Sequence, residues 1–194
     1  FKEVKNVYLR MRQICSGFIK LTTEVGEEVE IVFDENPKLE GLIELIREAP
    51  DDEKFVVFND YTKTGDIICE RLQKEKIGHT RLYSGTENKG EGLNKFKKDK
   101  DCRVYVINSA SGAMSLNLQN SRYIIFFECP KVINRLQASK RVHRTGQTRR
   151  VFEYDFIIKN TGEEKLLNYI TEGKDLYDEI LNNKDKKMLL SLLE

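Results

Sequence analysis

The sequence predicts an α/β domain in which a mainly parallel sheet lies between two layers of helices. The first observation is a set of five short runs that are rich in β-branched and aromatic residues. Nearly continuous apolar runs are typical of strands covered on both faces, as in a parallel sheet. The second observation is that helical patterns separate these runs, which favours a three-layer arrangement with right-handed crossovers.

Each predicted strand ends at a polar loop. The strands are expected at residues 55–58, 80–83, 104–107, 123–127 and 152–158. In open parallel sheets, ligands gather at the carboxyl ends of the strands and on the loops that follow them. We therefore expect one edge of the sheet to collect the loops 59–64, 84–86, 108–117 and 128–131.

Apolar residues at helical spacing predict the connecting helices. The patterns are Leu39, Leu42, Ile43, Leu45 and Ile46; Ile67, Ile68 and Leu72; Leu93 and Phe96; and the run 133–141. Before them, residues 18–23 and 29–33 around Gly26 are typical of a β-hairpin. Residues 176–193 predict one or two amphipathic helices. We expect one domain over 1–194, with a lead-in helix and hairpin in 1–37, a core in 38–172 and C-terminal helices in 173–194.

The composition and charge of the chain exclude only some functional classes. The chain has 194 residues, a formal net charge of +1 and no apolar run near the roughly 18 residues of a membrane span. We expect no membrane partner, and a nucleic-acid partner must bind through local patches. Four cysteines without a Cys-x-x-Cys pair indicate free thiols and an intracellular location, cytoplasmic in a bacterium or virus and nuclear in a eukaryote. With two histidines, no metal site is expected.

The segment 137–147 carries the strongest chemical signal. Gln137, Arg141 and Arg144 stand at helical spacing, and a Gly-Gln turn follows. The window 131–150 holds seven Lys or Arg and no Asp or Glu. Because guanidinium groups are permanently charged and can bind two oxygens at once, this pattern predicts phosphate binding. A solvated basic helix is the alternative.

At these residues the chain resembles motif VI of the SWI/SNF-type ATPases, a branch of the superfamily-two helicases. Matches continue in the family's order over roughly residues 38–160. The upstream segments 56–62, 81–86, 108–118 and 128–130 resemble motif IV, segment IVa, motif V and the turn before motif VI. The opening residue Phe1 and this likeness suggest a piece of a longer polypeptide. The resemblance implies the second, C-terminal RecA-like lobe of such a motor.

The resemblance also implies roles for individual residues. Arg141 and Arg144 would be arginine fingers that face ATP bound to the first lobe, and Gln137 would orient or support them. Gly112 would be the motif V glycine that lets the backbone approach the lobe interface. This chain has Ser-Gly-Ala-Met-Ser at 111–115, where the family is richer in glycine.

Polar residues on the strand-end loops are candidates for nucleic-acid phosphates. They are Thr62, Lys63, Ser84, Gly85, Thr86, Asn108 and Asn117. Hydroxyls, amides and backbone N–H groups can hold phosphates without reading bases. Ser84 and Gly85 are equally ordinary turn residues. The lysines near 89–100 are either a solvated helix face or an extension of a DNA track.

The sequence lacks two nucleotide-binding motifs, and their absence determines the mechanism that we predict. The chain has no Gly-x-x-x-x-Gly-Lys-Ser/Thr loop and no Asp-Glu pair at a strand end. ATP and Mg²⁺ would therefore be held mainly by a missing first lobe, and these residues alone would not hydrolyse ATP. We expect part of a DNA-dependent ATPase or translocase acting on double-stranded DNA. The alternatives are an RNA or single-strand helicase lobe and a stand-alone nucleic-acid-binding module.

His143 and Glu128 are residue types that often act in catalysis, but we expect no catalytic role for either. His143 has no nucleophile or orienting carboxylate near it in sequence, so we do not expect a general base. Glu128 follows a predicted strand, and we expect it to serve as a hydrogen-bonding end to that strand.

Overall fold

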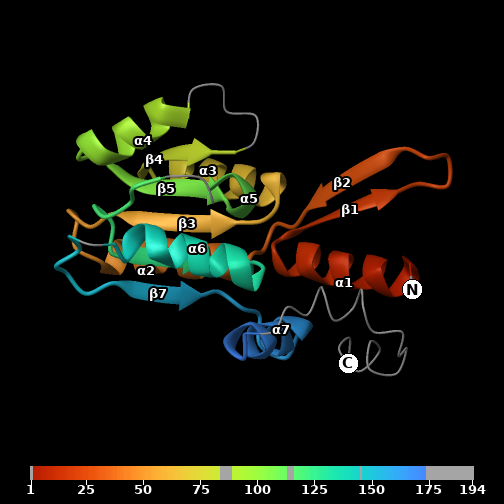
Figure 1. Cartoon of the computed structure of the whole chain (residues 1–194). Coiled ribbons are helices and arrows are strands. Elements are labelled where there is room, and N and C mark those ends of the chain that lie inside the picture. The colour runs from red at the N-terminus through yellow and green to blue at the C-terminus, as the bar shows by residue number, and fades with distance from the viewer. Residues whose placement is uncertain (1, 84–88, 113–115, 145, 174–194) are drawn as a thin grey trace. The chain divides into compact units, whose positions relative to one another are not determined.

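The computed structural model describes all residues except 1, 84–88, 113–115, 145 and 174–194 (Figure 1). The chain divides into two compact units, one from Phe1–Lys38 with Ile157–Glu194 and one from Leu39–Phe156. The domain boundaries expected near residues 37 and 172 stay predictions. The helices expected at 176–193 lie outside the described residues.

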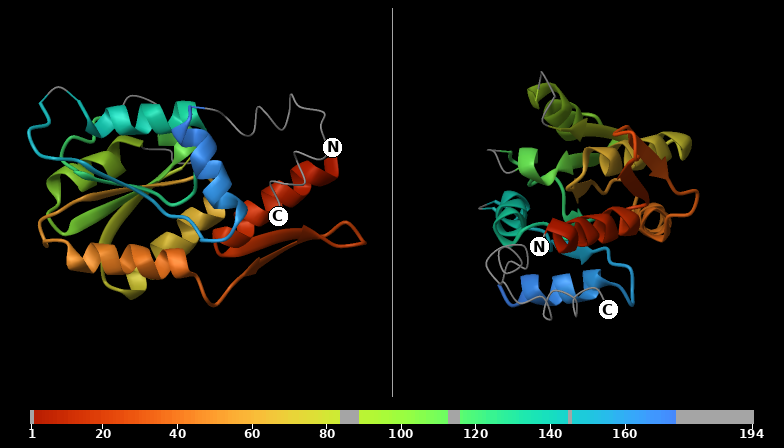
Figure 2. Two further views of the ribbon diagram at one scale, coloured as in Figure 1. Left: turned by 90° about the horizontal axis from the view of Figure 1, so that it is seen from below. Right: turned by 90° about the vertical axis from the view of Figure 1, so that its right-hand side faces the viewer.

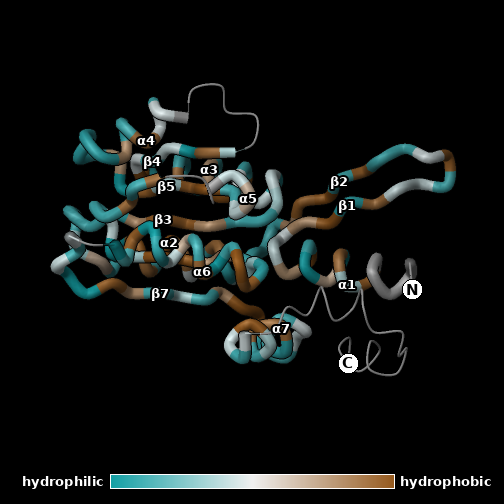
Figure 3. Tube along the Cα trace, viewed as in Figure 1, coloured by the Kyte–Doolittle hydropathy of each residue, from teal (hydrophilic) through white to brown (hydrophobic). Residues whose placement is uncertain are grey.

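The larger unit contains the five predicted strands in one parallel sheet. These are β3 (Phe55–Asn59), β4 (Gly78–Leu82), β5 (Cys102–Asn108), β6 (Tyr123–Phe126) and β7 (Phe152–Asp155). Their order is β4-β5-β3-β6-β7, and every neighbouring pair is parallel. Strands β3 and β5 are apolar along most of their length (Figure 3). The predicted parallel α/β sheet is confirmed.

Helices cover both faces of this sheet. They are α2 (Pro37–Glu48), α3 (Thr62–Lys74), α4 (Lys89–Lys98), α5 (Ser109–Gly112) and α6 (Val132–Val142). Val56 and Phe58 belong to the buried cluster that includes Phe96 of α4 and Val142 of α6. Because side chains alternate along a strand, Val57 points to the other face, where α2 and α3 lie. The left view of Figure 2 shows the sheet between α6 and α2, as predicted for three layers.

The smaller unit contains the predicted hairpin and two helices. Strands β1 (Phe18–Thr22) and β2 (Glu28–Val32) pair antiparallel, and α1 (Lys2–Cys15) and α7 (Gly162–Thr171) complete the unit. Gly26 turns the hairpin with a φ of 85°, a conformation that glycine adopts without strain. At the start of α7, the Thr161 side chain accepts a hydrogen bond from the Glu163 N–H at 3.2 Å. This cap begins the helix.

Three local predictions are wrong. Strand β7 ends at Asp155 rather than at residue 158, because its partner β6 ends at Phe126 and offers no further rung. Helix α3 already begins at Thr62, inside the loop expected at 59–64. The loop expected at 108–117 contains α5, since the Asn108 Oδ1 accepts the Ala110 N–H at 3.1 Å and starts a helical turn.

Candidate functional site

Helix α6 carries two of the three residues singled out in the 137–147 segment. Ala138 and Val142 are one turn apart and are buried in the core, which fixes that face of the helix. Gln137 and Arg141 flank this buried stripe and are half-buried. Arg141 also lies in the last turn, where a cation interacts favourably with the helix dipole. The helical spacing of Gln137 and Arg141 is therefore confirmed.

Arg144 does not lie on this helix, contrary to the prediction. Helix α6 ends at Val142, and His143 is its C-cap. The Arg144 N–H donates to the Val142 carbonyl at 3.0 Å, and the Arg144 carbonyl accepts the Gln147 N–H at 2.9 Å. Its side chain is exposed. The two arginines are thus held by different structures, Arg141 by a packed helix and Arg144 by the turn after it.

In the folded structure, carboxylates from outside residues 131–150 lie next to some of the basic residues of this window. Arg135 forms a bidentate ion pair with Asp155 of β7, with one contact at 2.9 Å. The Arg149 guanidinium lies 3.5 Å from the Glu53 Oε1. Both carboxylates come from outside the 131–150 window. Part of the positive charge therefore holds the fold together, and Arg144 stays exposed without an acidic partner among the described residues.

His143 and Glu128 occupy structural positions. The His143 Nε2 lies 3.2 Å from a carboxylate oxygen of Glu153 on β7. Glu128 is 1% exposed and accepts the Asp60 N–H and the Thr64 hydroxyl, both at 2.5 Å. Glu128 therefore ties the end of β6 to the turn between β3 and α3. Its predicted role as a hydrogen-bonding strand end is confirmed.

The carboxyl ends of β3 and β5 meet, as the sequence predicts. Asn59 and Asn108 are register partners at the last rung of this pair. The Asn108 Nδ2 donates to the Asp60 carbonyl at 2.8 Å, and the Asn59 Nδ2 donates to the Tyr61 carbonyl at 2.6 Å. Both amides thus shape the loop that leads into α3.

Thr62 and Lys63 form the first turn of α3, next to this pair of strand ends. Thr62 is exposed and Lys63 is half-buried. Arg81 of β4 braces this turn, because its Nη2 donates to the Thr62 carbonyl at 2.6 Å and its Nη1 pairs with Asp66. A Cβ on Gly65 would lie 2.7 Å from Arg81, so glycine permits this approach. The structure therefore groups Thr62 and Lys63 with Asn108.

The remaining candidates are separated from this group or lie outside the described residues. The Asn117 Oδ1 accepts the Gln119 N–H at 3.2 Å, and the next residue, Leu118, donates its N–H to the Arg141 carbonyl at 3.2 Å. Asn117 thus lies near the end of α6. Gly112 ends α5. Ser84, Gly85 and Thr86 are outside the described residues, and the roles of all these residues stay predictions.

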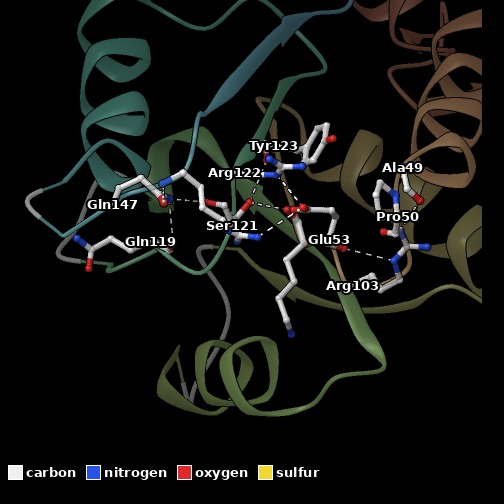
Figure 4. A network of polar contacts seen from close by, with 11 residues as sticks. Ala49, Pro50, Glu53, Arg103, Gln119, Ser121, Arg122, Tyr123 and Gln147 are labelled. Atoms are coloured by element: carbon white, nitrogen blue, oxygen red, sulfur yellow. Dashed lines mark hydrogen bonds and ion pairs between the residues drawn. The ribbon is translucent and has the colours of Figure 1, made fainter.

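A polar network near Gln147 was not anticipated (Figure 4). The Gln147 side chain donates to the carbonyls of Gln119 and Ser121 at 2.9 and 3.1 Å. Close by, Glu53 is paired with Arg122 at 2.7 Å. The sequence marked Gln147 only as part of a phosphate-binding pattern. Its carbonyl partners are backbone atoms, so no residue type could have signalled them.

A comparison with protein families identifies the domain. Residues 37–150 match the helicase conserved C-terminal domain. The chain belongs to this family. The matched range contains the parallel sheet through β6, helix α6 and both arginines.

Similar proteins and a solved structure agree with this family and define its branch more closely. The chain is 31% identical over 183 residues to the DNA repair protein rad8 of Schizosaccharomyces pombe, covering 89% of this chain and 16% of rad8. It is 31% identical over 152 residues to a RAD54-like DNA repair and recombination protein of Drosophila ananassae, covering 76% of this chain and 19% of that protein. The chain thus spans less than a fifth of either relative.

The C-terminal part of the Fun30 ATPase domain has a similar structure. The TM-score is 0.66 at 27% sequence identity, over 69% of this chain and 45% of that one. Together with the family match, this shows a C-terminal RecA-like lobe of the SWI/SNF type. Across the described ranges, no helix combines the length and the apolar character needed to span a bilayer.

Proposed function

We propose that this lobe is half of the motor of a DNA-dependent ATPase that translocates on double-stranded DNA. The observation that carries the proposal is the placement of Arg144, exposed and without a carboxylate partner among the described residues, immediately after the helix that holds Arg141. Such a guanidinium is available to a phosphate supplied from outside the chain. Arg141 and Arg144 would then stabilise charge on the γ-phosphate of ATP, with Gln137 supporting Arg141.

ATP and Mg²⁺ would be held mainly by an N-terminal RecA-like lobe. The chain itself has no Gly-x-x-x-x-Gly-Lys-Ser/Thr loop to cradle the phosphates. What it offers is two cationic side chains at one end of α6, which fit the outer side of a triphosphate. Gly112, at the end of α5, would line the same lobe interface. The residues present therefore suit one half of a composite ATP site.

The DNA backbone would bind at the carboxyl edge of the sheet. The first turn of α3 carries exposed Thr62 and half-buried Lys63, and its N-cap residue Tyr61 makes no side-chain cap hydrogen bond. The N–H groups of this turn and the helix dipole favour a phosphate. Asn108 would position this turn, and Ser84, Gly85, Thr86 and Asn117 would extend the contact. The names of the relatives, which include DNA repair proteins, support DNA as the partner.

Closure and opening of the two lobes would couple these sites. With ATP between the lobes, closure would bring Arg141 and Arg144 onto the γ-phosphate, where an arginine finger contributes about 10³ to 10⁵ in rate. Opening after hydrolysis would shift the DNA-gripping loops along the backbone. Contacts to phosphates rather than bases would allow movement over any sequence.

The direct test is to substitute each arginine in a protein that carries both lobes. Arg141→Ala and Arg144→Ala should each lower the DNA-stimulated ATPase kcat about 10³-fold, because the developing charge loses its partner. The matched control is Lys140→Ala, since Lys140 is an exposed cation on the same helix. Full activity of either arginine variant would contradict the proposal.

Strand preference separates duplex translocation from the other helicase class. The ATPase of the two-lobe protein should respond most strongly to double-stranded DNA. Stronger stimulation by RNA or by single strands would instead indicate an RNA or single-strand helicase lobe. Nucleic-acid binding without any stimulated ATPase would indicate a binding module.

A further inference from the structure

The side chain of Gln147 makes three hydrogen bonds, all of them to the protein's own backbone. Its Nε2 donates to the carbonyls of Gln119 at 2.9 Å and Ser121 at 3.1 Å (Figure 4). Its Oε1 accepts the Arg149 N–H at 3.2 Å. Both amide hydrogens and one acceptor site are therefore used within the lobe. We infer that Gln147 is the positioning residue of Arg144, an inference that rests on the proposed function.

Gln147 is linked directly to Arg144 by a closed turn. The Gln147 N–H donates to the Arg144 carbonyl at 2.9 Å. Gly146 has a φ of 103°, and a Cβ there would lie 3.4 Å from the Gln119 Nε2. The positive φ is a conformation that glycine adopts without strain, so glycine favours this turn. Because of the hydrogen bond between Gln147 and Arg144, fixing the Gln147 side chain also restrains the backbone of Arg144.

The same short segment also holds the other arginine. The Leu118 N–H donates to the Arg141 carbonyl at 3.2 Å, and the Asn117 Oδ1 accepts the Gln119 N–H at 3.2 Å. Segment 117–121 therefore bonds both to Arg141 and to Gln147. Residue 117 is also a proposed DNA contact. A displacement of this segment on DNA binding would be transmitted to both arginines.

A buried carboxylate anchors the chain just beyond the turn. Glu53 has a side chain that is 5% exposed and lies 2.7 Å from the Arg122 Nε and 3.5 Å from the Arg149 Nη1. Arg149 is the residue whose N–H reaches Gln147. The end of the turn is thus secured to the residues that precede β3 and β6, and Gln147 is the link between this anchor and Arg144.

The position of Arg144 after the end of α6 has a consequence for catalysis. Arg144 lies outside α6, so the helix does not fix its position. A misplacement of about 1 Å in a catalytic group can cost about 100-fold in rate. Removal of the Gln147 hydrogen bonds should therefore reduce turnover more than it reduces substrate binding.

The experiment compares side chains at position 147 in a protein that carries both lobes. Gln147→Met keeps the length of the side chain and removes its donors. We expect the kcat of the DNA-stimulated ATPase to fall about 10- to 100-fold, while KM for ATP changes by less than about threefold. Gln147→Lys should recover part of the loss, since the Lys54 ammonium of this chain donates to the carbonyls of Asp99 and Cys102 at 2.7 and 3.0 Å.

The controls separate positioning from folding and from the proposed function. Gln73→Met makes the same change at an exposed position of α3 and should leave kcat unchanged. Rates are normalised to the folded fraction, measured by circular dichroism. If Arg144→Ala is inactive, two results would overturn the inference. One is a normal kcat in Gln147→Met, and the other is a loss of DNA binding in proportion to the loss of turnover. If Arg144→Ala is fully active, the proposed function itself fails.

Discussion

Whether an arginine of this lobe is available for a phosphate depends on which carboxylate lies within reach. Arg135 stacks over the Phe126 ring, with 4.3 Å from its Cζ to the ring centroid, and pairs with Asp155. Arg144 has no such neighbour among the described residues and remains exposed. Both belong to the same basic window. Their different surroundings make Arg135 a structural residue and Arg144 the candidate for catalysis.

The cysteine thiols show how burial changes reactivity. Burial raises the pKa of the Cys69 thiol to about 11, and it also raises the pKa of the Cys15 and Cys102 thiols. The thiolate is the reactive form, so a raised pKa leaves less of it at neutral pH. These residues are free cysteines, as the sequence predicts.

Alkylation of Cys69 should therefore be slow in the folded protein. At pH 8, a thiol with a pKa near 11 has about 200-fold less thiolate than an unperturbed one near 8.5. The labelling rate should rise about tenfold for each pH unit below the folded pKa. Timed iodoacetamide labelling with mass spectrometry measures this, and the denatured protein is the control. Equal rates in the folded and denatured protein would contradict the prediction.

At the scale of elements, tertiary contacts determine where the helices begin and end. Apolar spacing correctly predicts α2, α3, α4 and α6, since each buries a stripe of residues such as Ala138 and Val142. The helical spacing of Arg141 and Arg144 wrongly suggests that both lie on α6, and the apolar spacing does not predict that Asn108 starts α5. Those boundaries depend on single hydrogen bonds between the backbone and neighbouring groups. The periodicity of the apolar residues does not contain that information.

In the smaller unit, a buried ion pair joins two elements that are distant in sequence. The Lys38 Nζ in the first turn of α2 lies 2.5 Å from the Glu163 Oε1 in the first turn of α7, and their side chains are 2% and 1% exposed. The second Glu163 oxygen accepts the Ile158 N–H at 2.9 Å. Removal of Glu163 would take away the carboxylate that faces a buried ammonium group, which costs more than the loss of an exposed ion pair.

Glu163→Ala should therefore lower the free energy of unfolding by about 3 to 5 kcal/mol. Urea denaturation followed by circular dichroism measures the change. The double variant Lys38→Met with Glu163→Leu should regain most of the stability, because it removes both charges together. A loss below about 1 kcal/mol in Glu163→Ala would show that the pair is solvated in solution.

At the scale of the whole molecule, the lobe offers one half of the proposed composite site. Its arginines stand at the end of α6, while no phosphate cradle occurs in the sequence. The proposed DNA contacts lie at the carboxyl edge of the same sheet, at the ends of β3 and β5. Segment 117–121 bonds to the Arg141 carbonyl and to the Gln147 side chain, so it links Asn117, a further proposed DNA contact, to the end of α6.

The 194 residues alone should not turn over ATP. Phosphate release should stay at the background rate with and without DNA, because nothing in the chain replaces the phosphate-binding loop. Circular dichroism confirms that the sample is folded, and the protein with both lobes is the positive control. Multiple turnovers by the pure chain would contradict the composite site.

The sequence by itself determined the strands, most of the helices and the family. These follow from periodic apolar burial and from motifs that are contiguous in the chain, such as 137–147. The tertiary structure alone decided which charges are neutralised, because Asp155 and Glu53 reach the basic window only after folding. It also decided that Gln147 binds backbone carbonyls, since a hydrogen bond to the main chain leaves no mark on residue type.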